Sequence, residues 1–202
     1  MNEAASGFSG SRHAQKGLPM EARDKNGLTE REFLEAYGKK EYPRPYVTAD
    51  TVVFSARRGA VLLVKRSGHP FMGCWALPGG FIRADESAEA GALRELREET
   101  GIVAAEAEPI GLFSSPGRDP RGWVISQAYL CMSDAEPTAG DDAADVRWFR
   151  ILLDSEKRPY LSCGDIRLYI GGDGQRPAFD HGEMIAQAIK KIMKKREELI
   201  YV

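Results

Sequence analysis

The stretch that decides the fold runs from residue 80 to residue 102 and reads GFIRADESAEAGALRELREETGI. Its second half, residues 87–100, contains no proline and is rich in Ala, Leu, Glu and Arg, which predicts a helix. Gly101 follows at the position where a left-handed residue commonly ends a helix. The first half, with residues 78–80 before it, predicts a loop that leads into this helix.

Three glutamates of the predicted helix, Glu95, Glu98 and Glu99, lie at spacings of three and four residues and therefore share one helical face. Like charges at these spacings repel by roughly 0.2–0.5 kcal/mol per pair on an isolated helix. Arg94 can offset the charge of Glu98, four residues on, but not all three charges. Two readings follow: a solvated charged face, or a site where several oxygens bind a hard divalent cation.

The complete pattern of the stretch favours the cation site. The residues that stand at fixed gaps are Gly80, Glu86, Arg94, Glu95, Leu96, Glu98, Glu99, Gly101 and Ile102. At each of these positions the stretch resembles the signature of Nudix hydrolases. The resemblance implies an α/β protein, a Nudix-type α/β/α sandwich with a mixed β-sheet. It also implies hydrolysis of a nucleoside diphosphate linked to another group.

The resemblance further implies which residues act. Divalent cations neutralise pyrophosphate oxygens and make water a usable nucleophile near neutral pH, so Mg²⁺ is the expected cofactor, with Mn²⁺ as an alternative. The expected catalytic residues are Arg94, Glu95, Glu98 and Glu99, and the expected metal-binding residues are Gly79 (through its carbonyl), Glu86, Glu95, Glu98 and Glu99. Glu86 is expected to support the loop or an outer metal shell, and Arg94 to orient the carboxylates.

The identity of the general base stays open at this point. One of the three signature glutamates is a candidate. Acidic residues outside the signature, Asp141, Asp142 and Asp145, are a second source, and a solvated acidic turn is the alternative reading of that segment.

Substrate choice depends on residues 115–122, SPGRDPRG, whose Pro, Gly and Asp alone predict a surface turn. The segment also resembles the Arg-Asp-Pro-Arg loop of ADP-ribose pyrophosphatases, and Arg44-Pro45 and Phe179-Asp180-His181 are similar to segments of the same group. The resemblance implies hydrolysis of ADP-ribose to AMP and ribose 5-phosphate. The candidate substrate-binding residues are Arg44, Arg66, Arg118, Asp119 and Arg121.

Two other functions remain open. A nucleoside-triphosphate-cleansing hydrolase would share the signature, but the Arg118 loop argues against it. A non-catalytic ADP-ribose-sensing module that regulates transcription normally carries an appended DNA-binding domain, and here the chain ends at Val202 directly after its last predicted helix. The intact set of carboxylates also favours turnover.

Composition narrows the partners. The 202 residues carry a net charge of −2, so no basic field attracts nucleic acid or an anionic membrane. Three cysteines without metal-ligand spacing indicate a reducing compartment, and no apolar run reaches membrane-spanning length, so we expect a cytoplasmic protein. The expected partner is a small nucleotide substrate, with neither nucleic acid nor membrane. The resemblance adds a homodimer.

The domain organisation follows from local signals. We expect a disordered tail over residues 1–27 and one Nudix domain over residues 28–202, with an inserted hairpin at about residues 153–177. A capping box of Thr29 and Glu32 predicts a first helix that ends near Gly38, and Asp180 with Glu183 predicts a similar box for the last helix. His181 is expected to hold the start of that helix. The predicted strands cover residues 47–54, 60–65, 109–113, 123–132, 146–149 and, within the insertion, 167–170, followed by a turn at 171–174.

Overall fold

The computed structural model describes residues 22–140 and 143–200, and the chain divides into two units, Met1–Arg44 and Pro45–Val202. In the first unit, helix α1 covers Glu30–Gly38. Its capping box is present, because the Thr29 hydroxyl accepts from the Glu32 N–H while the Glu32 carboxylate accepts from the Thr29 N–H at 2.8 Å. The predicted start and end of this helix are therefore confirmed. Of the expected tail, residues 1–21 lie outside the described part of the chain, and residues 24–27 include a turn.

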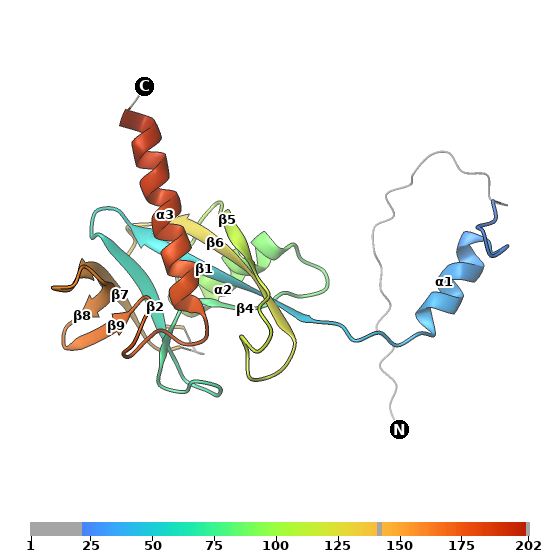
Figure 1. The fold of residues 1–202 in the computed structure, drawn as a ribbon, viewed down its shortest axis with the longest axis horizontal. Coiled ribbons are helices and arrows are strands. Elements are labelled where there is room, and N and C mark those ends of the chain that lie inside the picture. Colours follow the sequence, from blue (N-terminus) through green and yellow to red (C-terminus); the bar gives the residue numbers. More distant parts are fainter. Residues whose placement is uncertain (1–21, 141–142, 201–202) are drawn as a thin grey trace. The chain divides into compact units, whose positions relative to one another are not determined.

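The second unit is built on one mixed sheet (Figure 1), whose strands run in the order β5-β6-β1-β2-β7-β8-β9, with β3 added to β2 and β4 added to β1. Strand β1 is parallel to β6 and antiparallel to β2 and β4. The strands are β1 Tyr46–Ser55, β2 Ala60–Arg66, β3 Trp75–Ala76, β4 Gly79–Phe81, β5 Glu108–Phe113, β6 Val124–Met132, β7 Ala143–Leu153, β8 Pro159–Cys163 and β9 Ile166–Tyr169.

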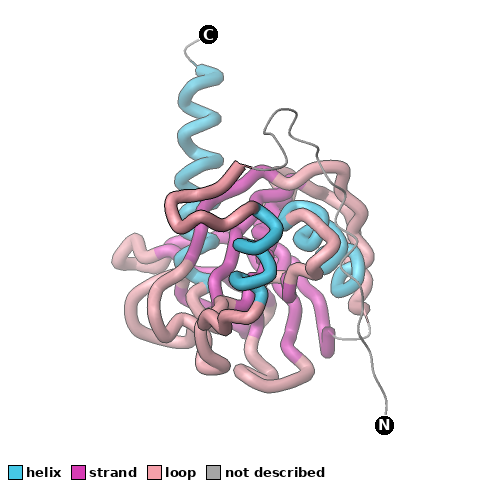
Figure 2. Tube along the Cα trace, turned by 90° about the vertical axis from the view of Figure 1, so that its right-hand side faces the viewer, coloured by secondary structure: helices cyan, strands magenta, loops and turns pink. Residues whose placement is uncertain are grey.

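Both faces of the sheet are apolar, because neighbouring strand residues point to opposite sides. Val52 packs in a cluster with Ile185 of helix α3, His181–Ile200. Val53, the next residue of β1, packs in a separate cluster with Leu96 of helix α2, Ala88–Thr100. One helix thus covers each face, which confirms the expected α/β/α sandwich. The C-terminal end of α3 projects beyond the sheet in both views (Figures 1 and 2).

Strand β4 differs from the sequence-based expectation of a loop. Gly79 and Gly80 of β4 pair with Asp50 and Ala49 of β1. A Cβ on Gly79 would lie 2.4 Å from the Ala49 carbonyl oxygen, so only glycine allows this approach. The local Pro-Gly-Gly signal predicts a turn, and the pairing depends on a strand about thirty residues earlier in the chain.

The insertion is a hairpin that extends the main sheet. Strand β8 pairs with β7 on one side and with β9 on the other. The turn between β8 and β9 lies at Gly164, whose φ of 55° is left-handed. The predicted turn at residues 171–174 is also present, because the chain bends there directly after β9, with Gly172 and Gly174 at positive φ. Leu161 and Leu168 of this hairpin are buried in the same cluster as Phe149 of β7, which gives the hairpin its attachment to the core.

The start of α3 also differs from the prediction. Both oxygens of the Asp180 carboxylate accept hydrogen bonds from Arg118, so this side chain pairs with a distant loop instead of forming the expected capping box.

The described residues include no helix with the length and apolar character that a membrane span requires.

Candidate active site

Helix α2 begins and ends as its sequence predicts. The Ser87 hydroxyl caps its start by accepting from the Ala90 N–H, and Gly101 ends it in the left-handed conformation at φ 68°. Ala92 and Leu96 are fully buried against the sheet and fix the orientation of the helix. The glutamate face is therefore held beside strand β4.

A single guanidinium connects three of the glutamates. Arg94 donates through Nε and Nη2 to the two oxygens of Glu86, at 3.0 and 2.6 Å. Its Nη1 donates to Glu95 at 2.6 Å and to Glu98 at 3.1 Å. The hydrogen bonds from Arg94, together with the Arg83 N–H, lower the pKa of Glu86 to about 2. Arg94 thus orients the carboxylates, with Glu86 as its firmest partner.

Glu99 lies outside this cluster and is the buried member of the set. Its Oε2 accepts from the Gly79 N–H at 3.0 Å, and it forms no salt bridge within the described ranges. Burial raises its pKa to about 8, and the negative charges of Glu95 and Asp50 add to the rise. Glu99 is therefore a buried carboxyl group without a direct ion pair in the described ranges, and the nearby charge of Arg66 and the Gly79 N–H only partly offset the rise in its pKa.

The donor set fits a hard divalent cation. Its members are carboxylate and carbonyl oxygens, without thiolate or imidazole, which is the chemistry that Mg²⁺ and Mn²⁺ prefer. Glu95 packs directly against the backbone of β4, since a Cβ on Gly80 would lie 2.5 Å from its carboxylate carbon. Among the described residues the carboxylates do not converge on one point, because Arg94 lies between Glu86, Glu95 and Glu98. Binding a cation would require Glu95 and Glu98 to turn from Arg94.

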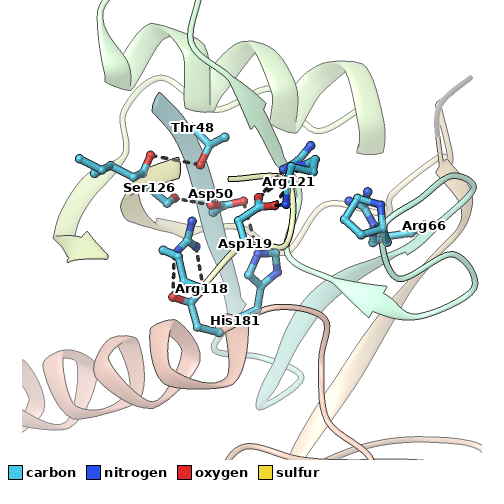
Figure 3. A network of polar contacts seen from close by, with 11 residues as sticks. Thr48, Asp50, Arg66, Arg118, Asp119, Arg121, Ser126 and His181 are labelled. Carbon is cyan, nitrogen blue, oxygen red and sulfur yellow. Dashed lines mark hydrogen bonds and ion pairs between the residues drawn. The ribbon is translucent and has the colours of Figure 1, made fainter. Parts of the chain in front are cut away.

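A cavity of about 270 Å³ opens beside Glu99. Charged and aromatic side chains from β1, β2, β4, the end of α2, the loop after β5 and the segment that leads into α3 line it. Figure 3 labels several of the polar ones. The lining residues that carry charge or an aromatic ring are Asp50, Lys65, Arg66, Phe81, Glu99, Arg118, Asp119, Arg121, Phe179 and His181.

Two arginines of the cavity are each held by their own carboxylate. Arg118 donates through Nε and Nη2 to Asp180, at 2.8 and 2.6 Å, and only 4% of its side chain is exposed. Arg121 donates through the same two atoms to Asp119, at 3.0 and 2.7 Å. In both cases the Nη1 group carries no hydrogen bond to another described residue and remains for a ligand. The loop therefore presents oriented guanidinium groups, which a simple surface turn would not do.

Arg66 lacks such a carboxylate within the described ranges. Its Nε donates to the Pro70 carbonyl at 2.7 Å, and its guanidinium lies 5.2 Å from the ring centre of Phe179. Arg121 lies 5.7 Å from the same ring and 4.9 Å from that of Phe81. Burial lowers the pKa of Arg66, and the nearby positive charge of Arg121 lowers it further. The two cations together make the cavity attractive for an anion.

Comparison with known proteins identifies this site. The family model described as NUDIX domain matches residues 45–153, more than half of the chain. The chain belongs to the Nudix family. The matched residues include the acidic helix and the loop that carries Arg118 and Arg121.

Relatives of this Nudix protein include enzymes and regulators. The chain is 39% identical over 123 residues to an ADP-ribose pyrophosphatase of Methanocaldococcus jannaschii, covering 57% of this chain and 72% of the relative. It is also 39% identical to the ADPR responsive transcriptional repressor NtrR of Acinetobacter baylyi, over 53% of this chain but only 44% of the repressor. The solved NUDIX domain of Shewanella oneidensis NrtR, complexed with ADP ribose, is 33% identical with a TM-score of 0.65, covering 82% and 99% of the two chains. These findings establish the class of a Nudix hydrolase.

The structure brings most of the predicted substrate residues of the Nudix domain together. Arg66, Arg118, Asp119 and Arg121 all line the cavity with Gly79 and Glu99. Arg44 belongs to the first unit of the chain and has no defined place relative to the cavity. Of the acidic residues outside the signature, 141 and 142 lie outside the described part, and Asp145 on β7 pairs with Arg147 at 2.6 Å.

Sequence reasoning missed one carboxylate of the cavity and underrated a histidine. Asp50 lies within β1 and accepts a hydrogen bond from the Ser126 hydroxyl of β6. The signal was present: a charged residue stands in the middle of the apolar run of β1, where a buried side chain is expected. His181, expected to hold the helix start, instead accepts at Nδ1 from the Leu77 N–H at the cavity wall.

Proposed function

We propose that this Nudix hydrolase cleaves the pyrophosphate bond of ADP-ribose and releases AMP and ribose 5-phosphate, with Mg²⁺ or Mn²⁺ as cofactor. One observation carries the proposal: Glu99, a buried carboxyl group without a direct ion pair among the described residues, lies at the wall of a cavity that also presents three arginines. A cation-requiring carboxylate beside a phosphate-attracting surface is what pyrophosphate hydrolysis needs.

The acidic face of α2 would hold the cation. Glu95, Glu98 and Glu99, with the Gly79 carbonyl, would supply its oxygen ligands, while Glu86 keeps Arg94 in place. When bound, the cation would neutralise phosphate oxygens and lower the pKa of a coordinated water. Because Glu99 is already positioned by the Gly79 N–H, it needs the smallest movement of the three.

The cavity arginines would bind and orient the pyrophosphate. The Nη1 groups of Arg118 and Arg121 are unused by their carboxylates, and each guanidinium is already fixed in orientation by two hydrogen bonds. Prior fixation reduces the side-chain entropy that substrate binding would otherwise cost. Arg66 adds a third cation, which contacts the Pro70 carbonyl and forms no direct ion pair with a carboxylate of the described residues.

The second candidate function is an ADP-ribose sensor without turnover, favoured by the similarity to the repressor and to the ADP-ribose-bound NUDIX domain. The complete glutamate set with its Arg94 cluster favours hydrolysis. A triphosphate-cleansing role fits less well, because the arginine loop resembles that of ADP-ribose pyrophosphatases.

The test is a substrate panel assayed with Mg²⁺ and, separately, with Mn²⁺. We expect ADP-ribose to be cleaved faster than ADP-glucose, NADH or deoxynucleoside triphosphates, with AMP and ribose 5-phosphate as products. Glu99→Gln serves as the inactive control. Tight ADP-ribose binding without products would establish the sensor instead, and preferential cleavage of triphosphates would contradict the substrate assignment.

The homodimer and the absence of nucleic-acid binding remain predictions. Sedimentation at micromolar concentration tests the first, and a dimer is expected. Titration with duplex DNA, with and without ADP-ribose, tests the second.

A further inference from the structure

Two buried polar side chains lie next to each other at the floor of the cavity (Figure 3). Asp50 comes from β1 and His181 from the start of α3, and their exposed fractions are only 6% and 4%. Both line the cavity. Neither belongs to the glutamate cluster of α2 or to the arginine loop.

The hydrogen bond to His181 determines where its ring carries the proton. The Leu77 N–H donates to Nδ1 at 2.8 Å, so Nδ1 presents a lone pair. A neutral imidazole then has its proton on Nε2, which makes Nε2 a donor. This Nε2–H faces Asp50, with Nε2 at 3.6 Å from Oδ1.

Asp50 has one oxygen satisfied and one that is not. Its Oδ2 accepts from the Ser126 hydroxyl. Its Oδ1 accepts no hydrogen bond from the described residues, and the 3.6 Å separation from His181 is too long for one. A donor and an acceptor thus stand side by side at the cavity without bonding to each other. Neither is among the fully buried side-chain atoms without a partner in the described part of the chain, which are Thr51 Oγ1 and Trp148 Nε1, so both are open to a ligand.

The chemistry of the pair selects its ligand. A phosphate oxygen would accept from His181 but be repelled by Asp50, and an ammonium group would have the opposite difficulty. A hydroxyl group accepts and donates at once, so it can take the Nε2–H and give its own proton to Oδ1. The terminal ribose of ADP-ribose carries three free hydroxyls and no base, and therefore offers more such groups than the adenosine ribose.

We propose that Asp50 and His181 form a hydroxyl-binding subsite that recognises the terminal ribose of the substrate. The inference rests on the proposed function. In this arrangement the arginines would bind the charged phosphates, while Asp50 and His181 would form hydrogen bonds with the neutral sugar. The subsite would distinguish ADP-ribose from nucleoside triphosphates, which place a third phosphate where the sugar would lie.

The test compares binding of ADP-ribose with binding of analogues that lack one hydroxyl of the terminal ribose, and with an analogue that lacks one hydroxyl of the adenosine ribose. Binding is measured by calorimetry in EDTA, so that no turnover occurs. For the wild-type protein we expect one analogue to bind about tenfold to a hundredfold more weakly, the cost of a lost hydrogen bond to a charged group. Asp50→Asn should weaken binding of ADP-ribose to a similar degree. The variant should also lose most of the difference in affinity between ADP-ribose and the analogue that the wild type binds weakly.

Asp119→Asn is the matched control, because Asp119 is an equally buried carboxylate of the same cavity whose oxygens are taken by Arg121. Asp119→Asn should lower the affinity for ADP-ribose and for the weakly bound analogue by the same factor, so the difference between them should remain. The wild-type comparison alone needs no variant, so it stands even if Asp50→Asn fails to fold.

Equal wild-type affinity for all analogues would overturn the subsite, since a bound water would then satisfy the pair. Weak binding only of an analogue altered in the adenosine ribose would overturn the assignment to the terminal ribose. Discrimination in a protein that does not hydrolyse ADP-ribose would support the subsite and contradict only the proposed reaction. If the wild type does not bind ADP-ribose, both proposals fail.

Discussion

The acidic face of α2 gathers negative charges, whereas the arginine wall of the cavity, formed by Arg118 and Arg121, gathers positive charges. The two regions differ in how these charges are compensated. Glu95 and Glu98 of the helix share the guanidinium of Arg94 with Glu86 of the preceding loop, and Arg83 adds a second, weaker contact to Glu98 at 3.7 Å. Glu99 forms no ion pair in the described part of the chain. On the wall, Arg118 has Asp180 and Arg121 has Asp119, one carboxylate for each arginine.

The difference indicates which region must rearrange when a cation and a phosphate-containing substrate bind. The helix carries excess negative charge, so a cation would relieve repulsion and draw Glu95 and Glu98 from Arg94. The wall is balanced and already oriented, so it would bind phosphate with little rearrangement. We expect substitutions on the helix to affect catalysis and metal affinity, and substitutions on the wall to affect substrate affinity.

The largest expected effect is on turnover. Glu99→Gln keeps the shape of the side chain but removes the charge that a cation would need, and should lower kcat for ADP-ribose by at least about 10²-fold. Steady-state kinetics with Mg²⁺ measure it. Glu89→Gln is the control, since Glu89 lies on the same helix but contacts the Ala107 N–H away from the cavity. A near-normal kcat of Glu99→Gln would contradict a catalytic role for the acidic face of α2.

On the wall, Arg118→Ala should raise KM for ADP-ribose by about tenfold to a hundredfold, and should lower kcat much less. The reason is that, in the proposed mode of binding, Arg118 would contact phosphate in both the ground state and the transition state. Arg158→Ala is the matched control, because Arg158 makes a similar pair with Asp154 on the surface, at 2.8 Å. Unchanged ADP-ribose kinetics in Arg118→Ala would reduce the loop to a turn.

Without metal, stability should fall as pH rises. Folding raises the pKa of Glu99 from 4.5 to about 8, so the folded state keeps a proton that the unfolded chain releases. The contribution is complete below pH 4.5, declines as pH rises and levels off above pH 8. Between pH 6 and pH 8 the free energy of unfolding should drop by about 2 kcal/mol.

Urea denaturation in EDTA at several pH values checks this dependence. Glu99→Gln should flatten it, and Glu89→Gln should retain it. The same slope in the wild type and in Glu99→Gln would show that Glu99 does not titrate in this range.

The smallest expected effect is stabilisation by the cation. Mg²⁺ at ten times its dissociation constant should stabilise the fold by about 1.4 kcal/mol and raise Tm. Glu98→Gln should blunt the rise, whereas Glu106→Gln, an exposed residue beyond the helix, should not. Thermal melts with and without Mg²⁺ measure it, and equal shifts in the wild type and Glu98→Gln would exclude Glu98 as a ligand.

The elements that the sequence alone determined are those specified by neighbours along the chain. Helix α2 with its Ser87 cap and Gly101 end, and the capping box of α1, depend on contacts within a few residues. The main strands were recognisable as short apolar runs between turn residues, although their pairing partners are distant. The glutamate face also follows from spacing, because three and four residues separate neighbours on any α-helix. The Nudix signature was therefore readable without coordinates.

Only the tertiary structure decided how the cavity is assembled. Arg118 meets Asp180 across 62 residues, and Leu77 meets His181 across 104. The residues next to Asp50 in the sequence indicate only that it belongs to a strand. It becomes part of a site because β4, β6 and α3 pack around it. Polar side chains carry no periodic signal for distant partners, so the placement of Asp50 beside His181 appears only once the sheet and helix α3 have packed together.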